Sequence, residues 1–537
     1  MPPLLARFAA LMAATAWGCG DGGTDSSRVA AGGDPDDRAG GLAVVCLEGQ
    51  PESLNPFLSP DQFSADLASL LFTPLVRYGE DGEIEPYLAK EWSWDEAHQR
   101  LALEIRSDVE WHDGAPVSAE DVAWTLRTAA NPDYGAWSGP DLETLLEATA
   151  LDPVRVEIRF STPFAAGLEP FVGIPILPHH LLGELDSEEF TRASYHREPI
   201  GSGPYRLVAR NPDGSLAFER APAFPEELGD AYLDRLIVRP IAEDVTRIAE
   251  LRTGGADACV TGSAVADELQ AVEGIEILPL EPSAVQVIVL DTRTPLFSEA
   301  AVRRALSASL VRDELAAVIS PLARPARTEL PPSSPWLEPA TGQPDADPAL
   351  ADSLLEAAGW RPVDGGGTRL NAAGEELRFT ITSPPLLRNL LTAVQGQLRR
   401  HGIQADLEFM EWASYVRRLQ DPDARPEAMA LTFVPERILH PDLSGTYASS
   451  SPMNIASYVS AAVDSVLDRL NAAMEREELK ELYGALQRHL AEDVPILYTA
   501  YAPRLLAVGP RLRNVRPGIG SPLQFVTEWW IPRDARR

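Results

Sequence analysis

Few side chains in this sequence have the type and spacing that catalysis or metal binding requires. His179 and His180 are adjacent, and adjacent side chains point apart unless a turn brings them together, so we interpret the pair as structural. Trp111–Gly114 has the composition of an active-site tetrad, yet its Asp-Gly step suits a tight turn. Gly201–Gly203 lacks the Lys-Ser/Thr of a phosphate-binding loop and the Gly-x-Ser-x-Gly spacing of a hydrolase. We therefore predict no enzyme activity, no catalytic residue, no metal site and no cofactor.

Two aromatic residues are better candidates for ligand binding. Trp412 and Tyr415 offer flat apolar surface with a polar handle, which suits stacking against a varied ligand. Alternatively, Trp412 packs the junction between a strand and a helix, and the sequence leaves both interpretations open.

The charge balance narrows the possible partners. The 537 residues include 80 Asp and Glu against 46 Lys and Arg, which gives a formal net charge of −34. Such a surface repels phosphate backbones and anionic lipid headgroups, so nucleic-acid binding is not expected. The three cysteines form no Cys-x-x-Cys pair, which argues against a zinc ribbon or a disulfide-stapled miniprotein. A chain of this length implies two or three domains.

The N-terminus resembles an export signal followed by a tether. Arg7 precedes the apolar run Phe8–Trp17, which is too short to span a bilayer that needs roughly 20 helical residues. The run ends before Cys19 in a sequence similar to the lipobox of bacterial lipoproteins, although two of its positions depart from the usual residues. We expect residues 1–19 to be a signal peptide with lipidation at Cys19, or plain cleavage as the alternative. Residues 20–41 are rich in Gly, Asp and Ser and are expected to form a flexible tether.

Hydrophobic periodicity predicts strands and helices in the rest of the chain. Leu42–Leu47 is a continuous apolar run that suits a strand of a buried parallel sheet. Strand, helix and strand follow one another over 377–382, 390–401 and 403–409, which is the pattern of a βαβ unit. Ser118, with an acidic residue three places later, predicts a helix that opens with a capping box.

Two further expectations concern the second half of the chain. A single long helix is predicted from about Ser298 to Ile319, with Arg303 and Arg312 on its outer face. Ala326–Pro348 is thick with Pro and Ser and is expected to be a long surface loop.

A series of segments in a fixed order resembles a known family. They are PYLAKEW at 86–92, VEWHDGAPVSAEDVAWTL at 109–126, IGSGPYRL at 200–207, LFSEAAVRRALSASLVRDEL at 296–315, DPALADSLLEAAGW at 347–360, QLRRHGIQADLEFMEWASYVRRL at 397–419 and LYGALQRHLAEDVPILYTAY at 482–501. Together they are similar to the extracytoplasmic solute-binding proteins of ABC transporters, specifically the peptide/nickel-type family 5. The resemblance covers nearly everything after residue 41.

The resemblance implies an α/β fold of the periplasmic-binding-protein type II, with two α/β lobes joined by a hinge and an extra β-rich domain. Two connections, near Ala284 and Leu497, would form the hinge, and closure would trap the ligand between domains I and III. The implied boundaries are 42–75, 200–284 and 498–537 for domain I, 76–199 for domain II and 285–497 for domain III.

The same resemblance would put Cys46 and Cys259 on neighbouring strands of domain I. We favour two buried thiols, and a disulfide is the alternative in an oxidising compartment.

The resemblance also implies where the ligand binds. Trp412 and Tyr415 belong to a Glu-Trp-x-x-Tyr segment whose aromatics often line the cleft. Peptide binders of the family carry an Asp that holds the ligand ammonium, but the matching position here is Arg437. An arginine repels an ammonium and suits a carboxylate, phosphate or sulfate, so we favour an anionic or neutral ligand. In the alternative interpretation Glu436 supplies the anion. Weaker candidates are Tyr447, Met453 and Asn454, which follow Arg437 in the same segment, and from domain I the loop after the first strand, which includes Gln50, is expected to border the cleft.

By this resemblance the chain would be the extracytoplasmic (periplasmic) substrate-binding component of an ABC transporter. It would capture a peptide or other small solute by hinge closure and deliver it to a membrane permease. Its partners would be the ligand, the permease and ATPase subunits, and the membrane through an N-terminal lipid, with the protein itself a monomer. Two alternatives are a sensory solute receptor without import and an exported hydrolase that has reused the fold.

Overall fold

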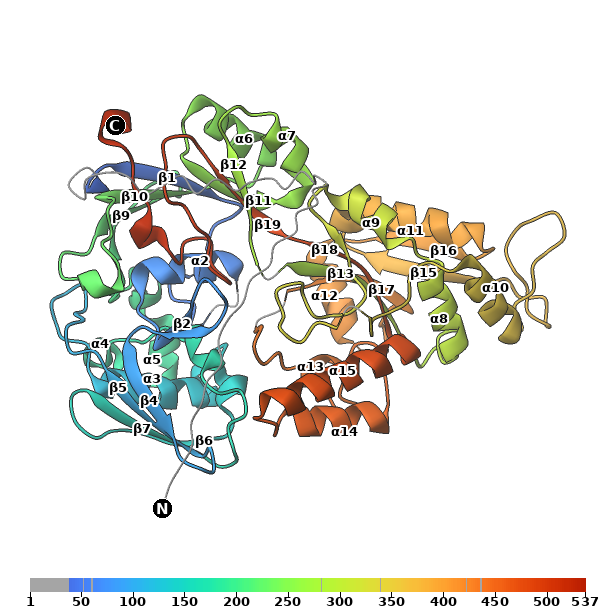
Figure 1. Ribbon diagram of the computed structural model, residues 1–537, viewed down its shortest axis with the longest axis horizontal. Coiled ribbons are helices and arrows are strands. Elements are labelled where there is room, and N and C mark those ends of the chain that lie inside the picture. Colours follow the sequence, from blue (N-terminus) through green and yellow to red (C-terminus); the bar gives the residue numbers. More distant parts are fainter. Residues whose placement is uncertain are drawn as a thin grey trace, which may run out of the picture.

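The computed structural model describes residues 38–537, apart from 52, 59–60, 282, 339, 422, 435–436 and the side chain of Gln420. Figure 1 shows two α/β bodies side by side, with a smaller β-rich unit beneath the one that holds β1. We call these bodies the first lobe and the second lobe.

A seven-stranded sheet forms the first lobe, in the order β12-β19-β11-β1-β10-β9-β8. The predicted strand Leu42–Leu47 (β1) is confirmed, and it pairs in parallel with β10 and β11 on its two sides. The other strands are β8 (Tyr205–Arg210), β9 (Leu216–Arg220), β10 (Arg235–Pro240), β11 (Ala258–Gly262), β12 (Glu276–Pro279) and β19 (Arg504–Val508).

The β-rich unit carries an antiparallel sheet in the order β4-β5-β7-β6. Its helix α3 (Ala119–Ala130) opens as predicted, because the Ser118 side chain accepts the Asp121 N–H while the Asp121 carboxylate accepts the Ser118 N–H. The strands are β4 (Ala89–Trp94), β5 (Arg100–Ile105), β6 (Leu145–Ala150) and β7 (Arg155–Phe160); the hairpin β2 (Val76–Tyr78) and β3 (Ile84–Pro86) leads into them.

A six-stranded sheet forms the second lobe, in the order β14-β18-β13-β17-β15-β16. The predicted βαβ unit is confirmed as β15 (Arg378–Ser383), α11 (Arg388–Arg400) and β16 (Gln404–Phe409), with the two strands parallel. The remaining strands are β13 (Ala284–Leu290), β14 (Arg324–Pro325), β17 (Ala428–Phe433) and β18 (Ile496–Ala502).

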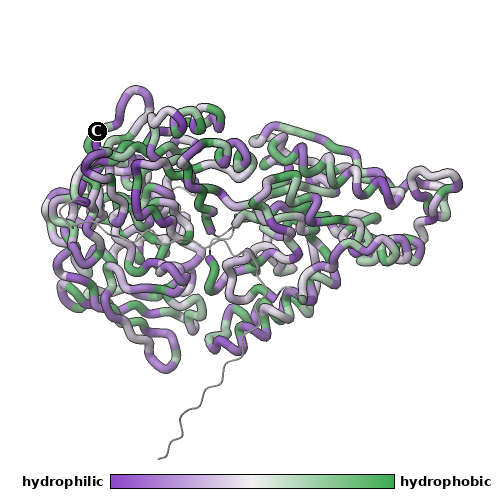
Figure 2. Tube along the Cα trace, turned by 45° about the horizontal axis from the view of Figure 1, so that its top comes forward, coloured by the Kyte–Doolittle hydropathy of each residue, from purple (hydrophilic) through white to green (hydrophobic). Residues whose placement is uncertain are grey.

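Helices cover the sheets, and Figure 2 shows many hydrophilic segments along the outer loops and helices. In the first lobe and the β-rich unit they are α2 (Gln62–Leu71), α4 (His179–Leu182), α5 (Ser187–Arg192), α6 (Asp244–Thr253) and α7 (Ala266–Gln270). In the second lobe they are α8 (Ala300–Ala308), α9 (Arg312–Ile319), α10 (Pro348–Ala357), α12 (Trp412–Gln420), α13 (Ser444–Tyr447), α14 (Ala461–Leu470) and α15 (Arg476–Asp493).

The prediction of one long helix over 298–319 was wrong, because the chain breaks it into α8 and α9. Arg303 and Arg312 are buried rather than on an outer face. Arg303 donates to the carbonyls of Phe297 and Asp493, and Arg312 donates to that of Tyr498. These partners lie up to 190 residues away in the sequence, so helical periodicity alone could not reveal them.

The segment predicted as a surface loop over 326–348 is irregular up to the start of α10, but much of it is buried. Leu330 and Trp336 belong to the core of the second lobe. Trp336 stacks on Tyr483 of α15 with ring centroids 5.4 Å apart. This segment therefore contributes side chains to the hydrophobic core of the second lobe.

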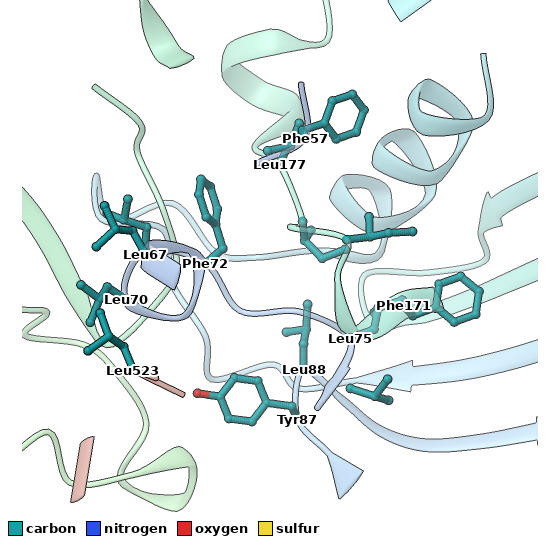
Figure 3. Packing of buried hydrophobic residues seen from close by; sticks show 14 of the residues in the cluster. Phe57, Leu67, Leu70, Phe72, Leu75, Tyr87, Leu88, Phe171, Leu177 and Leu523 are labelled. Atoms are coloured by element: carbon teal, nitrogen blue, oxygen red, sulfur yellow. The ribbon is translucent and has the colours of Figure 1, made fainter. Parts of the chain in front are cut away.

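One continuous hydrophobic cluster joins the first lobe to the β-rich unit. Figure 3 shows part of it, where side chains from α2 and the residues after it lie beside side chains of the β-rich unit; those labelled from the latter are Tyr87, Leu88, Phe171 and Leu177. The second lobe has hydrophobic clusters of its own.

The chain crosses between the lobes twice. One crossing lies between β12 and β13, near the predicted Ala284, and the other lies between Ala502 and Arg504, because β18 continues to Ala502 in the second sheet. The second crossing is therefore further along the chain than the predicted Leu497.

Candidate functional site

The carboxyl ends of parallel strands come together at one edge of each lobe. In the second lobe these strands are β15, β16 and β17, and in the first lobe they are β1, β10 and β11. β18 ends at this edge of the second lobe, and β19 begins at this edge of the first, with Pro503 between them. The two carboxyl edges therefore meet at the crossing, which is the position where open α/β sheets bind ligands.

Large apolar side chains are exposed at the carboxyl edge of the second lobe. Leu386 follows β15, Trp412 follows β16 and Val434 follows β17, and they are 88%, 60% and 55% exposed. Trp412 begins α12, whose N-cap Glu411 accepts hydrogen bonds from the N–H groups of Ala413 and Ser414. Three exposed apolar side chains at one edge are suited to cover the apolar part of a ligand.

A cation lies at the same edge. Arg388 begins α11, and its guanidinium lies over the Phe409 ring, 3.9 Å from the centroid. Its side chain has no ion-pair partner among the residues described. Stacking fixes the plane of the guanidinium and leaves its N–H groups available, which is the arrangement used to bind a carboxylate or phosphate.

The facing edge of the first lobe carries carboxylates that are already paired. Arg504 contacts Asp66 at 2.7 Å and Glu48 at 3.1 Å. Burial lowers the pKa of Arg504, but the two carboxylates outweigh it and raise the pKa overall. Gln50, predicted to border the cleft, is exposed in the loop after β1 and lies against Gly214.

Three of the predicted binding residues are buried. Tyr415 donates its hydroxyl hydrogen to the carbonyl of Ala430 at 2.7 Å, and Tyr447 shares a 2.5 Å hydrogen bond with the hydroxyl of Tyr498. Asn454 donates to the carbonyl of Tyr458 at 2.7 Å and accepts from its N–H. These contacts support the second lobe, and in this conformation the three side chains offer almost no surface to a ligand.

Arg437 contacts the β-rich unit. Its guanidinium pairs with Asp141 at 3.3 Å, and its side chain is 14% exposed. Burial raises the pKa of Asp141, while Arg437 acts in the opposite direction. Thus Arg437, which was predicted to bind an anionic ligand, is already paired with a carboxylate of the protein, that of Asp141. Glu436 and Cys19 lie outside the described residues.

Sequence reasoning missed Leu386 and Arg388. The signal was the pair Pro384-Pro385 directly after a buried strand, which had to end β15 and turn the chain at the carboxyl edge.

The motifs first considered for catalysis have structural partners. The ring of His112 lies between the Gly203 carbonyl at 3.0 Å and the Gly201 N–H at 3.2 Å. His180 contacts Asp113 at 2.8 Å. Cys46 and Cys259 are directly opposite each other on β1 and β11, and both are buried free thiols. Within the described residues no group of three or more His, Cys, Asp or Glu could hold a metal ion.

Two lobes, two crossings and facing carboxyl edges define a hinged solute-binding protein. Across residues 83–432 the chain matches the family described as bacterial extracellular solute-binding proteins, family 5 Middle. Oligopeptide-binding protein AppA of Bacillus subtilis (strain 168) is 23% identical over 533 residues, covering 96% of this chain and 95% of AppA. Glutathione-binding protein GsiB of Pectobacterium atrosepticum is 24% identical over 85% of this chain and 88% of GsiB.

Solved structures share the fold. The structure of AppA from Bacillus subtilis in complex with a nonapeptide aligns with a TM-score of 0.76 at 22% identity, covering 92% of this chain and 99% of AppA. NikZ from Campylobacter jejuni in complex with Ni(L-His) aligns with a TM-score of 0.77 at 23% identity, covering 91% of this chain and 99% of NikZ.

The chain belongs to family 5 of the bacterial extracellular solute-binding proteins. Its fold is that of the type II periplasmic binding proteins. It is an extracytoplasmic substrate-binding component of an ABC transporter, which captures a peptide or other small solute and delivers it to a permease. No helix in the described part of the chain is long and apolar enough to cross a membrane.

Proposed function

We propose that the ligand lies between the two carboxyl edges, against Leu386, Trp412 and Val434, with an anionic group on Arg388. The observation that carries this proposal is Arg388 itself. Its guanidinium is stacked on Phe409 and has no ion-pair partner among the described residues, and an exposed tryptophan, Trp412, lies at the same carboxyl edge. In a chain with a net charge of −34, such a cation is suited to binding a negative group.

The ligand class that fits is a small organic anion or a short peptide bound through a carboxylate. The names of the relatives include binders of oligopeptides and of glutathione, which carry carboxylates. Arg437 follows Val434 by three residues and adds positive charge to this side, although Asp141 shares it. If Glu436 instead supplies an anion for a ligand ammonium, a free-amine peptide is the ligand.

The proposed layout has three domains, with domain II (76–199) attached to domain I and domain III closing on both through the hinge. The predicted lipobox supports lipidation at Cys19, which would tether the domains to the membrane beside the permease and ATPase. The protein itself would act as a monomer without enzyme activity.

Native mass spectrometry of protein purified without refolding would identify a co-purified solute. A free-amine peptide would favour Glu436 as the anchor, and an anionic non-peptide would favour the arginines. If no solute co-purifies, a thermal-shift screen of peptides with free and amidated C-termini would supply the probe.

The binding edge predicts a specific mutational pattern. Arg388→Ala should weaken a carboxylate-bearing probe by roughly tenfold to a hundredfold, because one charge-assisted hydrogen-bonded contact is lost. Trp412→Ala should weaken the same probe by roughly tenfold through loss of apolar contact. Calorimetric titration measures both affinities.

Arg399→Ala is the matched control, because Arg399 is exposed at the other end of the same helix. Equal affinities for Arg388→Ala and Arg399→Ala would remove Arg388 from the site. Amidating the carboxylate of the probe should abolish the difference between wild type and Arg388→Ala.

A further inference from the structure

A buried carboxylate of the β-rich unit binds the backbone of the second lobe. Glu169 is 3% exposed. Its Oε1 accepts hydrogen bonds from the N–H groups of Ile438 and Leu439, both at 2.7 Å. Its Oε2 accepts the N–H of His440 at 2.5 Å. Three successive amides therefore converge on one carboxylate, which is the geometry of a backbone anion site.

Glu169 is held in place from its own side. The hydroxyl of Tyr78 donates to Oε1 at 2.5 Å, and the Gln524 side chain donates to the Tyr78 carbonyl. Glu169 begins a short 3-10 helix over Glu169–Val172 whose Phe171 is part of the cluster shared with the first lobe. The carboxylate thus moves with the first lobe and the β-rich unit.

The amides are held in place from the opposite side. Trp336 donates its indole N–H to the Leu439 carbonyl at 2.6 Å, and Tyr483 donates its hydroxyl hydrogen to the Pro441 carbonyl at 2.9 Å. Residues 437–441 therefore move with the second lobe. Residues 437–441 also come shortly after Val434, which belongs to the proposed binding edge. The segment that contacts Glu169 therefore lies close in sequence to the proposed ligand site.

We propose that Glu169 is a positioning residue that latches the second lobe to the β-rich unit when the protein closes. Any rotation at the two crossings that separates the lobes must break all three amide contacts together. When they break, water can solvate both the carboxylate and the amides, so the latch is reversible. The Arg437–Asp141 pair joins the same two parts and would open with it.

The latch goes beyond capture of the ligand, because it assigns the β-rich unit a role in holding the closed state. A ligand held between the carboxyl edges would favour the closed arrangement in which the three amides contact Glu169, and these contacts would slow its release. This coupling requires no contact between Glu169 and the ligand.

Hydrogen exchange tests the latch without a ligand. In Glu169→Ala the amides of Ile438, Leu439 and His440 should exchange at least about tenfold faster than in the wild type. Glu169→Gln keeps one acceptor oxygen but loses the charge, so an intermediate rate is expected. The control is Glu83→Gln, because Glu83 also reaches the second lobe, through an exposed 3.7 Å pair with Arg476, and its loss should change little.

A distance measurement separates the latch from a local packing role. Spin labels at Leu146→Cys and Arg469→Cys, in a Cys19→Ser background, would report on the β-rich unit and the second lobe; the native Cys46 and Cys259 are buried. Glu169→Ala should shift the distance distribution to longer values while Glu83→Gln should not. Wild-type exchange and distances in a folded Glu169→Ala would overturn the proposal, and Glu169→Gln decides in the same way if the alanine variant fails to fold.

Discussion

His112 shows at the scale of one residue why a motif that suggested catalysis is structural. Its Nε2 lies 3.0 Å from the Gly203 carbonyl and its Nδ1 accepts the Gly201 N–H. Both ring nitrogens are satisfied only in the neutral form with the hydrogen on Nε2. Burial lowers the pKa of His112 to about 4 from 6.5.

This environment predicts acid sensitivity. The unfolded chain binds a proton on His112 near pH 6.5 and the folded chain only near 4, so this contribution to stability is present above 6.5 and is lost as the pH falls towards 4. The loss should be about 2 kcal/mol by pH 5. Denaturant unfolding of the wild type and His112→Gln at pH 7 and pH 5 measures it; the glutamine variant should lose less stability over this interval. An identical loss in both proteins would assign the acid sensitivity to other groups.

At the scale of elements, α8 carries two neighbouring arginines with opposite environments. Arg303 is buried and its guanidinium donates hydrogen bonds to the carbonyls of Phe297 and Asp493, whereas Arg304 is exposed. Arg303→Ala should lower the free energy of unfolding by about 3 kcal/mol, because buried carbonyls lose their donor. Arg304→Ala should change it by less than about 0.5 kcal/mol. Chemical denaturation of the pair of variants checks the contrast, and similar values would mean that Arg303 is not required.

Elements governed by local rules could be predicted from the sequence. The strand Leu42–Leu47, the capping box at Ser118 and the βαβ unit that includes α11 are confirmed, because apolar runs, caps and periodicity act over a few residues. The break between α8 and α9, and the burial of Leu330 and Trp336, depend on partners distant in the sequence.

The candidate site was harder to predict for the same reason. The candidate Trp412 is exposed at the carboxyl edge of the second lobe, whereas the candidates Tyr415 and Asn454 are buried. An aromatic or amide side chain can line a cleft or support it, and only the register of the surrounding strands decides between these roles. The partners of Arg437 and Glu169 lie across the contact between the second lobe and the β-rich unit, so no local sequence pattern predicts them.

At the scale of the whole molecule, the shared hydrophobic cluster predicts which parts unfold together. Phe72 is buried in the cluster that joins the first lobe to the β-rich unit. Phe72→Ala should lower the unfolding free energy of these two parts by about 3–5 kcal/mol and should leave the second lobe with its own transition. Scanning calorimetry measures the transitions, and Leu467→Ala in the second lobe should produce the opposite pattern. A single transition that shifts equally in both variants would contradict the division.

The place of β19 in the first sheet has a consequence for how the protein is made. This strand lies between β11 (Ala258–Gly262) and β12 (Glu276–Pro279), yet it begins only at Arg504, because the whole second lobe is inserted between β12 and β19. In a chain that emerges from its N-terminus first, most of the second lobe is made while the first sheet still lacks this inner strand. Until residues 504–508 arrive, β11 and β12 present open edges of the kind that recruit other chains. During biogenesis the protein therefore needs protection at its earliest-made lobe, and that need ends with the arrival of one of the last strands to be made.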